Sequence, residues 1–247
     1  MSKRICMVAG ARPNFMKIAP IARAINRSKA QSGRLTFEIV HTGQHYDREM
    51  SDVFFEELGI PAPDHHLECG GGSHAEQTAK VMVAFEKICA QTPPDCVLVV
   101  GDVNSTLACS IVAKKLHIPL AHVEAGLRSG DLAMPEEINR LVTDSISDWF
   151  FCTEPAGVSN LLREGKAESS VFHVGHVMVD NLFYQRNKLL AMDRSGFHSS
   201  ILRKGLGDFG VVTLHRPSNV DDCKTLSGLA RALITISNDL PLIFPVH

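Results

Sequence analysis

The chain has 247 residues, 45% of them hydrophobic, and a formal net charge of −2. These values are ordinary for a globular protein of one large or two small domains, and they offer no basic field that would attract nucleic acid. No apolar stretch approaches membrane-spanning length, and the seven cysteines lack metal or redox spacing, so we predict a cytoplasmic protein with neither nucleic acid nor membrane as a partner.

Strand-like and helix-like segments alternate along the whole chain, which is typical of βαβ units in an α/β fold with a parallel sheet. Strands are predicted over residues 5–9, 35–40, 96–100, 120–123, 149–152, 171–174, 210–214 and 242–246, and helices over 13–26, 73–91, 105–116, 136–147, from 155, 178–190 and 222–238. We predict two domains, 1–174 and 175–247. The second is expected to be incomplete, because it holds far fewer elements than a usual doubly wound domain.

Three carboxylates follow these predicted elements at positions where α/β enzymes keep their chemistry. Asp102 comes after the strand 96–100, Glu124 after the strand 120–123, and Glu136 at a helix start. Ligands bind beyond the carboxyl ends of parallel strands, so the sequence predicts an active site here. Each acid also has a plain structural interpretation: a helix cap for Asp102, a buried ion pair for Glu124, and a pair with Arg140 for Glu136.

Basic residues and histidines follow other predicted strands. Arg12 and Lys17 flank the start of the first helix, which favours an anion such as phosphate, although two solvated cations beside a turn fit equally well. The glycine patterns of dinucleotide-binding and P-loop proteins are missing from this segment. His215 follows the strand 210–214, where it can donate a proton, contact a diphosphate or simply form a turn. His65 and His66 lack further ligands at metal spacing and are expected to be exposed.

Together these motifs resemble the non-hydrolysing UDP-N-acetylglucosamine 2-epimerases. The resemblance rests on the order and spacing of six segments: Gly-Ala-Arg-Pro-Asn-Phe-Met-Lys from Gly10, Thr-Gly-Gln-His-Tyr-Asp from Thr42, Gly-Asp at Gly101, His-Val-Glu-Ala-Gly-Leu-Arg from His122, Pro-Glu-Glu-Ile-Asn-Arg from Pro135 and Leu-His-Arg from Leu214. Many family members have Glu where this chain has Asn14, and family chains continue well beyond the point that matches His247.

The resemblance implies two Rossmann-like domains of the B-type glycosyltransferase fold, the second incomplete, with no metal, no cofactor and a homodimer as the assembly. It implies interconversion of UDP-N-acetylglucosamine and UDP-N-acetylmannosamine through elimination of UDP, a 2-acetamidoglucal intermediate and re-addition of UDP. The matching positions imply catalytic roles for Asp102, Glu124, Glu136 and His215, and substrate binding by Arg12, Lys17, Gln44, His45 and Arg140.

The residue types suit this chemistry, because carboxylates can stabilise charge developing at C1 and accept the weakly acidic proton at C2. Three alternatives stay open. A hydrolysing relative would release free N-acetylmannosamine and UDP, and a glycosyltransferase of the same fold would need an acceptor site. The third alternative is a non-catalytic fragment that keeps the first domain without a working UDP site.

Overall fold

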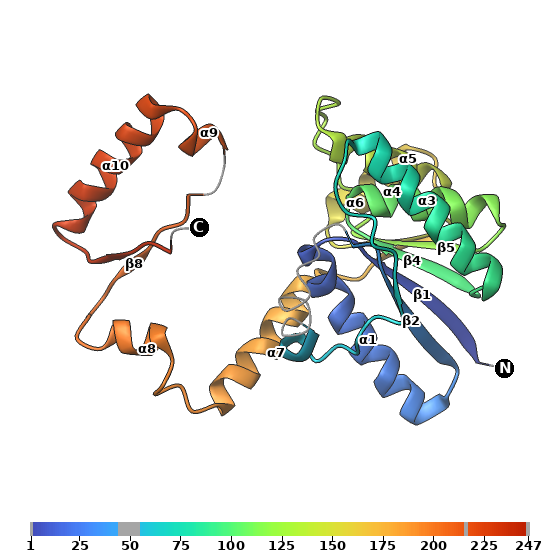
Figure 1. The fold of residues 1–247 in the computed structure, drawn as a ribbon, viewed down its shortest axis with the longest axis horizontal. Helices are drawn as coiled ribbons and strands as arrows, with labels where there is room; N and C mark the ends of the chain where they lie inside the picture. Colours follow the sequence, from blue (N-terminus) through green and yellow to red (C-terminus); the bar gives the residue numbers. More distant parts are fainter. Residues whose placement is uncertain (1, 44–54, 215–216, 246–247) are drawn as a thin grey trace. The chain divides into compact units, whose positions relative to one another are not determined.

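A computed structural model describes residues 2–43, 55–214 and 217–245 (Figure 1). The chain divides into two compact units, Met1–Asn187 and Lys188–His247. Each unit is an α/β structure with parallel strands, so the predicted fold class is confirmed. Among the described residues, no helix combines the length and the apolar character needed to span a membrane.

The first unit contains a sheet of seven parallel strands in the order β3-β2-β1-β4-β5-β6-β7. The strands are β1 (Lys3–Ala9), β2 (Leu35–His41), β3 (His65–His66), β4 (Cys96–Val100), β5 (Leu120–Val123), β6 (Trp149–Cys152) and β7 (Val171–His173). The chain runs outward from β1 in one direction through β2 and in the other through β4. The strand order therefore reverses between β1 and β4, and in doubly wound sheets this switch point is where ligands bind.

Helices cover both faces of this sheet. They are α1 (Arg12–Ser32), α3 (His74–Gln91), α4 (Asn104–Lys115), α5 (Pro135–Ile146), α6 (Pro155–Arg163) and α7 (Val177–Ala191), with a 3₁₀ turn at Glu168–Ser170. Successive residues of a strand point to opposite faces, so Val97 and Val99 join the core formed with α3 and α4, whereas Leu98 and Val100 join the core formed with α1. Both faces of the central strands are consequently apolar.

Three predicted strands, β4, β5 and β6, have the bounds that the sequence predicts. The strand β3 was not predicted. The expected exposure of the two histidines is confirmed for His66 and is wrong for His65, which is half-buried. His65 and His66 pair with Val40 and His41 of β2, and the carboxylate of Asp64 accepts a hydrogen bond from the Ile39 amide at 2.8 Å. A two-residue edge strand has no hydrophobic periodicity of its own, because pairing with β2 alone defines it.

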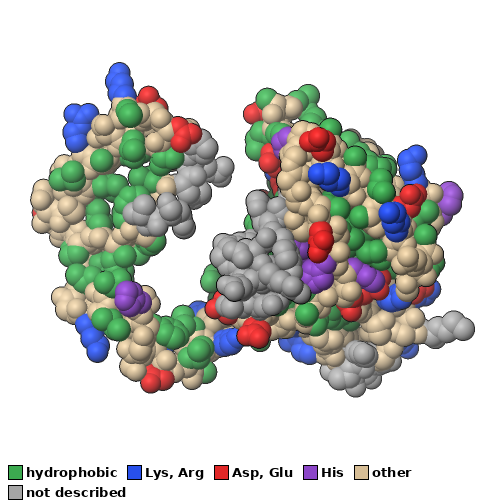
Figure 2. All heavy atoms as spheres, viewed as in Figure 1, with side chains coloured by type: hydrophobic (Ala, Val, Ile, Leu, Met, Phe, Trp, Pro, Cys, Tyr) green, Lys and Arg blue, Asp and Glu red, His purple; other side chains and the backbone are tan. Residues whose placement is uncertain are grey.

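The second unit has a two-stranded parallel sheet, β8 (Gly210–Val211) with β9 (Leu242–Ile243), and the helices α8 (His198–Arg203), α9 (Pro217–Val220) and α10 (Cys223–Ser237). The sequence predicted neither α8 nor α9. No described residue of this unit is buried, and Figure 2 shows hydrophobic side chains over much of its visible face. A unit this small encloses too little volume to remove its apolar side chains from water.

The first unit continues past Gly175, where the sequence places the domain boundary. Arg23 of α1 donates a hydrogen bond to the Asn181 side-chain oxygen at 2.9 Å, and its guanidinium lies over the Tyr184 ring, 3.8 Å from the ring centroid. Gln185 donates to the Glu57 carbonyl at 3.0 Å. These contacts attach α7 to α1 and to the segment that contains Glu57, and the compact unit ends at Asn187.

Candidate functional site

Asp102 lies directly beyond β4 and forms an ion pair with Arg140 of α5. The helix-cap interpretation of Asp102 is wrong, because the cap residue of α4 is Val103 and no side chain caps that terminus. Asn139, next to Arg140, donates to the Asp102 carbonyl oxygen at 2.8 Å. Consecutive residues of α5 therefore hold both the backbone and the side chain of Asp102.

Glu124 lies directly beyond β5, and its carboxylate pairs with the Lys17 ammonium of α1. Lys17 is only 7% exposed, so the interpretation of this lysine as a solvated cation is wrong. The pair packs against Gly101, the residue before Asp102. A Cβ atom on Gly101 would lie 2.7 Å from Lys17 Nζ and 3.6 Å from Glu124 Oε2. The structure thus brings the predicted residues Asp102, Glu124 and Lys17 to one place at the switch point.

Asn14 connects the loop after β1 to the end of β4. Its side-chain oxygen accepts hydrogen bonds from the amides of Gly10 and Ala11 at 3.0 and 2.9 Å, and its amide group donates to the Val100 carbonyl at 3.1 Å. The side chain is 2% exposed. The sequence showed Asn14 only as a departure from many family members. The sequence does carry one signal of this role. An asparagine in the first turn of a helix, just after a Gly-Ala turn, can accept hydrogen bonds from the backbone amides of that turn.

Glu137 is a site residue that the sequence analysis missed. Its carboxylate accepts hydrogen bonds from the Ser129 and Gly130 amides at 2.9 and 3.1 Å and pairs with Arg140 at 2.8 Å. Burial alone would raise the pKa of Glu137, but these bonds outweigh it and lower the pKa to about 2. Glu137 is therefore ionised, and it holds the guanidinium that faces Asp102.

Glu136 is half-buried in the first turn of α5. The proposed pair between Glu136 and Arg140 is not formed, because Arg140 binds Asp102 and Glu137 instead. Within the described part of the chain, the Glu136 carboxylate has no hydrogen bond or ion pair. Of the two adjacent glutamates, Glu137 thus has the structural role, whereas the Glu136 carboxylate is left available to contact a ligand.

Four further residues from the sequence analysis lie outside the described part of the chain. These are Gln44, His45 and His215, together with the side chain of Arg12. Their binding and catalytic roles stay predictions.

His41 supports the loop that leads to Gln44. Its ring stacks on Phe15 with centroids 5.2 Å apart, and its Nδ1 accepts a hydrogen bond from the Gly43 amide at 2.9 Å. Burial, with a smaller contribution from His66, lowers the pKa of His41 to about 4. An Nδ1 atom that accepts a hydrogen bond places the ring proton on Nε2, so His41 is neutral at physiological pH.

This lowered pKa predicts acid sensitivity. Below pH 6.5 the unfolded chain binds a proton at His41 that the folded chain does not bind until the pH nears 4. The unfolding free energy therefore falls on acidification, with His41 contributing about 2 kcal/mol of loss between pH 7 and pH 5. Urea unfolding at pH 7 and at pH 5 measures this loss of unfolding free energy.

In His41→Gln the difference in unfolding free energy between pH 7 and pH 5 should shrink by about 2 kcal/mol. The exposed control His173→Gln should keep the wild-type difference. Equal pH dependence in all three proteins would contradict the assignment.

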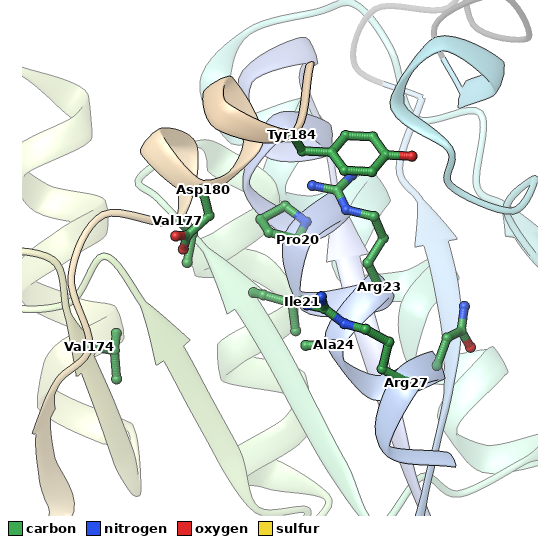
Figure 3. Close-up of a pocket in the computed structure, with 10 residues that line it drawn as sticks. Pro20, Ile21, Arg23, Ala24, Arg27, Val174, Val177, Asp180 and Tyr184 are labelled. Carbon is green, nitrogen blue, oxygen red and sulfur yellow. The ribbon is translucent and has the colours of Figure 1, made fainter. Parts of the chain in front are cut away.

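A hollow of about 780 Å³ lies between α1 and α7 (Figure 3), and Asp102, Glu124 and Glu136 do not line it. Its lining includes Pro20, Arg23, Arg27 and Tyr184, and none of the predicted site residues. Arg23 already has partners there, in Leu58, Asn181 and Tyr184. The candidate site is instead the group of charged residues beyond the ends of β4 and β5.

The described residues combine the pair of Glu124 with Lys17, the pairing of Arg140 with both Asp102 and Glu137, and the unpaired carboxylate of Glu136 in the first turn of α5. Carboxylates can accept a proton from carbon when the substrate is oriented against them, and ammonium and guanidinium groups bind phosphate oxygens. Across the described residues there is no group of His, Cys, Asp and Glu that could hold a metal ion. The carboxylates beside an ammonium and a guanidinium group suit the site to proton transfer on an anionic ligand.

Comparison with known proteins identifies a family. The protein-family model described as UDP-N-acetylglucosamine 2-epimerase matches residues 27–247 of this chain. The UDP-2,3-diacetamido-2,3-dideoxy-D-glucuronate 2-epimerase of Pseudomonas aeruginosa is 40% identical over 247 residues, and the UDP-N-acetylglucosamine 2-epimerase of Methanocaldococcus jannaschii is 40% identical over 249 residues. Each match covers 99% of this chain and 66% of the relative, so the chain spans about 66% of the length of these relatives.

Solved structures agree. The crystal structure of the M. jannaschii enzyme in complex with UDP-GlcNAc and UDP is 38% identical and superposes with a TM-score of 0.83, covering 99% of this chain and 66% of that one. A lipopolysaccharide outer core galactosyltransferase is 15% identical with a TM-score of 0.50, covering 70% of this chain and 45% of that one. That likeness concerns the fold alone, and it agrees with the predicted B-type glycosyltransferase fold.

Proposed function

This chain belongs to the UDP-N-acetylglucosamine 2-epimerase family, and from that premise we propose that the protein containing it inverts C2 of a UDP-linked 2-acetamido sugar. The observation that carries the proposal is the meeting of two ion pairs, Glu124 with Lys17 and Asp102 with Arg140, around Gly101. The pairs supply carboxylates for proton transfer beside cations for a diphosphate.

The proposed reaction has two halves. In the first, the C1–O bond breaks with its electrons leaving on UDP, and a carboxylate removes the C2 proton, which leaves 2-acetamidoglucal. In the second, a proton is added to C2 from the opposite face, and UDP oxygen bonds to C1 again. Asp102, Glu124 and Glu136 form the set that stabilises charge at C1 and moves the proton. We propose that Lys17, Arg140 and His215 hold the departing diphosphate.

A second substrate has equal support, because the relative that acts on UDP-2,3-diacetamido-2,3-dideoxy-D-glucuronate is as similar as the one that acts on UDP-N-acetylglucosamine. Both names describe 2-epimerases of UDP sugars. The chemistry at C1 and C2 is therefore the same for both candidates, and the difference concerns groups elsewhere on the sugar ring.

The test incubates the protein with each of the two UDP sugars in D₂O and follows C2 by NMR. We expect deuterium at C2 and formation of the C2 epimer with at least one substrate. Release of free N-acetylmannosamine together with UDP would instead identify a hydrolase. Absence of both exchange and hydrolysis with either sugar would refute the proposal. Titration calorimetry of the 247-residue chain with UDP shows separately whether these residues suffice to bind the nucleotide.

The assembly and the compartment also belong to this proposal. We propose a homodimer, which analytical ultracentrifugation tests directly. We place the protein in the cytoplasm, since the seven cysteines are free and five of them are buried, as is usual in a reducing compartment.

A further inference from the structure

The buried pair of His122 and Asp144, called the bracket below, connects the two backbone segments that carry Asp102 and Glu124. His122 of β5 is fully buried, and its two ring nitrogens have different partners. Nδ1 lies 2.6 Å from the Asp144 carboxylate of α5, and Nε2 lies 2.9 Å from the Gly101 carbonyl oxygen. His122 therefore spans from α5 to the end of the neighbouring strand.

Both partners of His122 are hydrogen-bond acceptors, so both ring nitrogens must carry a proton. A neutral ring would direct a lone pair at one of the two oxygen atoms. Asp144 stays ionised, because its other oxygen accepts from the Gly126 amide at 3.0 Å and from Arg128 at 2.7 Å. Burial alone would raise the pKa of Asp144, but His122 and Arg128 outweigh it and lower the pKa below its usual value. The buried ring is consequently an imidazolium.

The charges around this imidazolium are balanced on each side. Asp144 neutralises His122, and Arg128 pairs with Glu164 beyond the carboxyl end of α6 at 2.7 Å. On β6, burial raises the pKa of the Cys152 thiol to about 11, with Asp144 adding to it, so Cys152 is uncharged. The network has two cations and two anions and places no unpaired charge in the core.

The bracket acts on backbone that is held in an unusual conformation. Gly101 has φ +70°, and Glu124 has φ +73°, a value that residues with a Cβ atom rarely adopt. Such a conformation persists only where the surroundings hold it. His122 holds the carbonyl of Gly101, and Asp144 holds the amide of Gly126, two residues after Glu124. One charged pair thus restrains both carboxylate-bearing segments.

We propose that His122 is a positioning residue which, as a buried imidazolium bound to Asp144, sets the placement of the Asp102 and Glu124 carboxylates. Its catalytic consequence rests on the proposed function, because misplacing a reacting group by about 1 Å lowers a rate by about 100-fold. His122 itself does not touch the substrate in this assignment, and its effect is transmitted through the backbone of Gly101 and Gly126.

The first test is NMR of the 247-residue chain labelled with ¹⁵N-histidine, with the His122 signal identified by its loss in His122→Gln. We expect both ring nitrogens to be protonated at neutral pH, and one to lose its proton in Asp144→Asn. The same variant should speed amide hydrogen exchange at Gly126 at least about tenfold. The matched control Glu164→Gln removes an exposed partner of Arg128 and should leave both signals unchanged. A neutral His122 in the wild-type chain would overturn the proposal.

The second test separates positioning from a purely structural role. In the deuterium-exchange assay, Asp144→Asn and His122→Gln are expected to lower kcat about 10- to 100-fold with KM changed less than threefold, while Glu164→Gln keeps both values. A wild-type kcat in Asp144→Asn would overturn the positioning role. If the wild-type protein shows no exchange, the proposed function fails, and the amide exchange at Gly126 still decides whether the bracket holds this segment.

Discussion

Replacing Glu124 with Gln is expected to abolish deuterium exchange at C2, lowering its rate by at least about 100-fold. Gln has nearly the shape of Glu but can neither accept a proton nor carry the negative charge that the reaction requires. Asp102→Asn should have an effect of similar size for the same reason. Exchange is measured by NMR at saturating UDP sugar, and Glu86→Gln on the exposed face of α3 is the matched control.

Glu124→Gln also leaves Lys17 as a buried cation without its anionic partner. Removing one partner of a buried ion pair costs about 3–5 kcal/mol, so this variant should unfold at lower denaturant concentration. The double variant Lys17→Met with Glu124→Gln removes the unpaired charge and should recover much of that stability without recovering exchange. A folded Glu124→Gln protein that exchanges within a few-fold of the wild type would refute the role of Glu124.

Gly126→Ala is expected to destabilise the first unit by at least about 3 kcal/mol. A Cβ atom there would lie 2.3 Å from the carbonyl oxygen of Gly157 in α6, and the residue has φ +80°. Gly157 faces the same restriction, since its own Cβ atom would lie 2.7 Å from the Ala125 carbonyl oxygen. The α6 backbone therefore packs directly on the segment that follows Glu124, and neither side has a flexible group that can move away.

The matched control for this prediction is Gly165→Ala. Gly165 has φ +85°, and no atom lies within 4 Å of the place that a Cβ atom would occupy, so this variant reports the cost of the backbone conformation alone. We expect a loss of about 1 kcal/mol there, measured by urea unfolding. The larger loss of unfolding free energy expected in Gly126→Ala comes from the clash with the Gly157 backbone. Equal losses in the two variants would show that α6 can move away from this contact at little cost.

The sequence by itself determined the central strands and the place of the acids on them. The runs at β4, β5 and β6 are short and apolar, and polar or turn-forming residues bound them, so their limits follow from local pattern. Asp102 and Glu124 follow directly after two of these strands. Their proximity at one edge of the sheet follows from parallel pairing, which the alternation of strands and helices predicts.

Only the tertiary structure decided which partner each charged side chain has. Glu136 and Glu137 are adjacent and chemically alike, and the contacts of Glu137 with the Ser129 and Gly130 amides and with Arg140 make it the structural member of the two. Lys17 is buried because its side chain packs beside Gly101, beyond the end of β4, and pairs with Glu124 beyond the end of β5. Hydrogen bonds and ion pairs depend on distances of a few ångströms between segments far apart in the chain, and local sequence patterns carry no information about such distances.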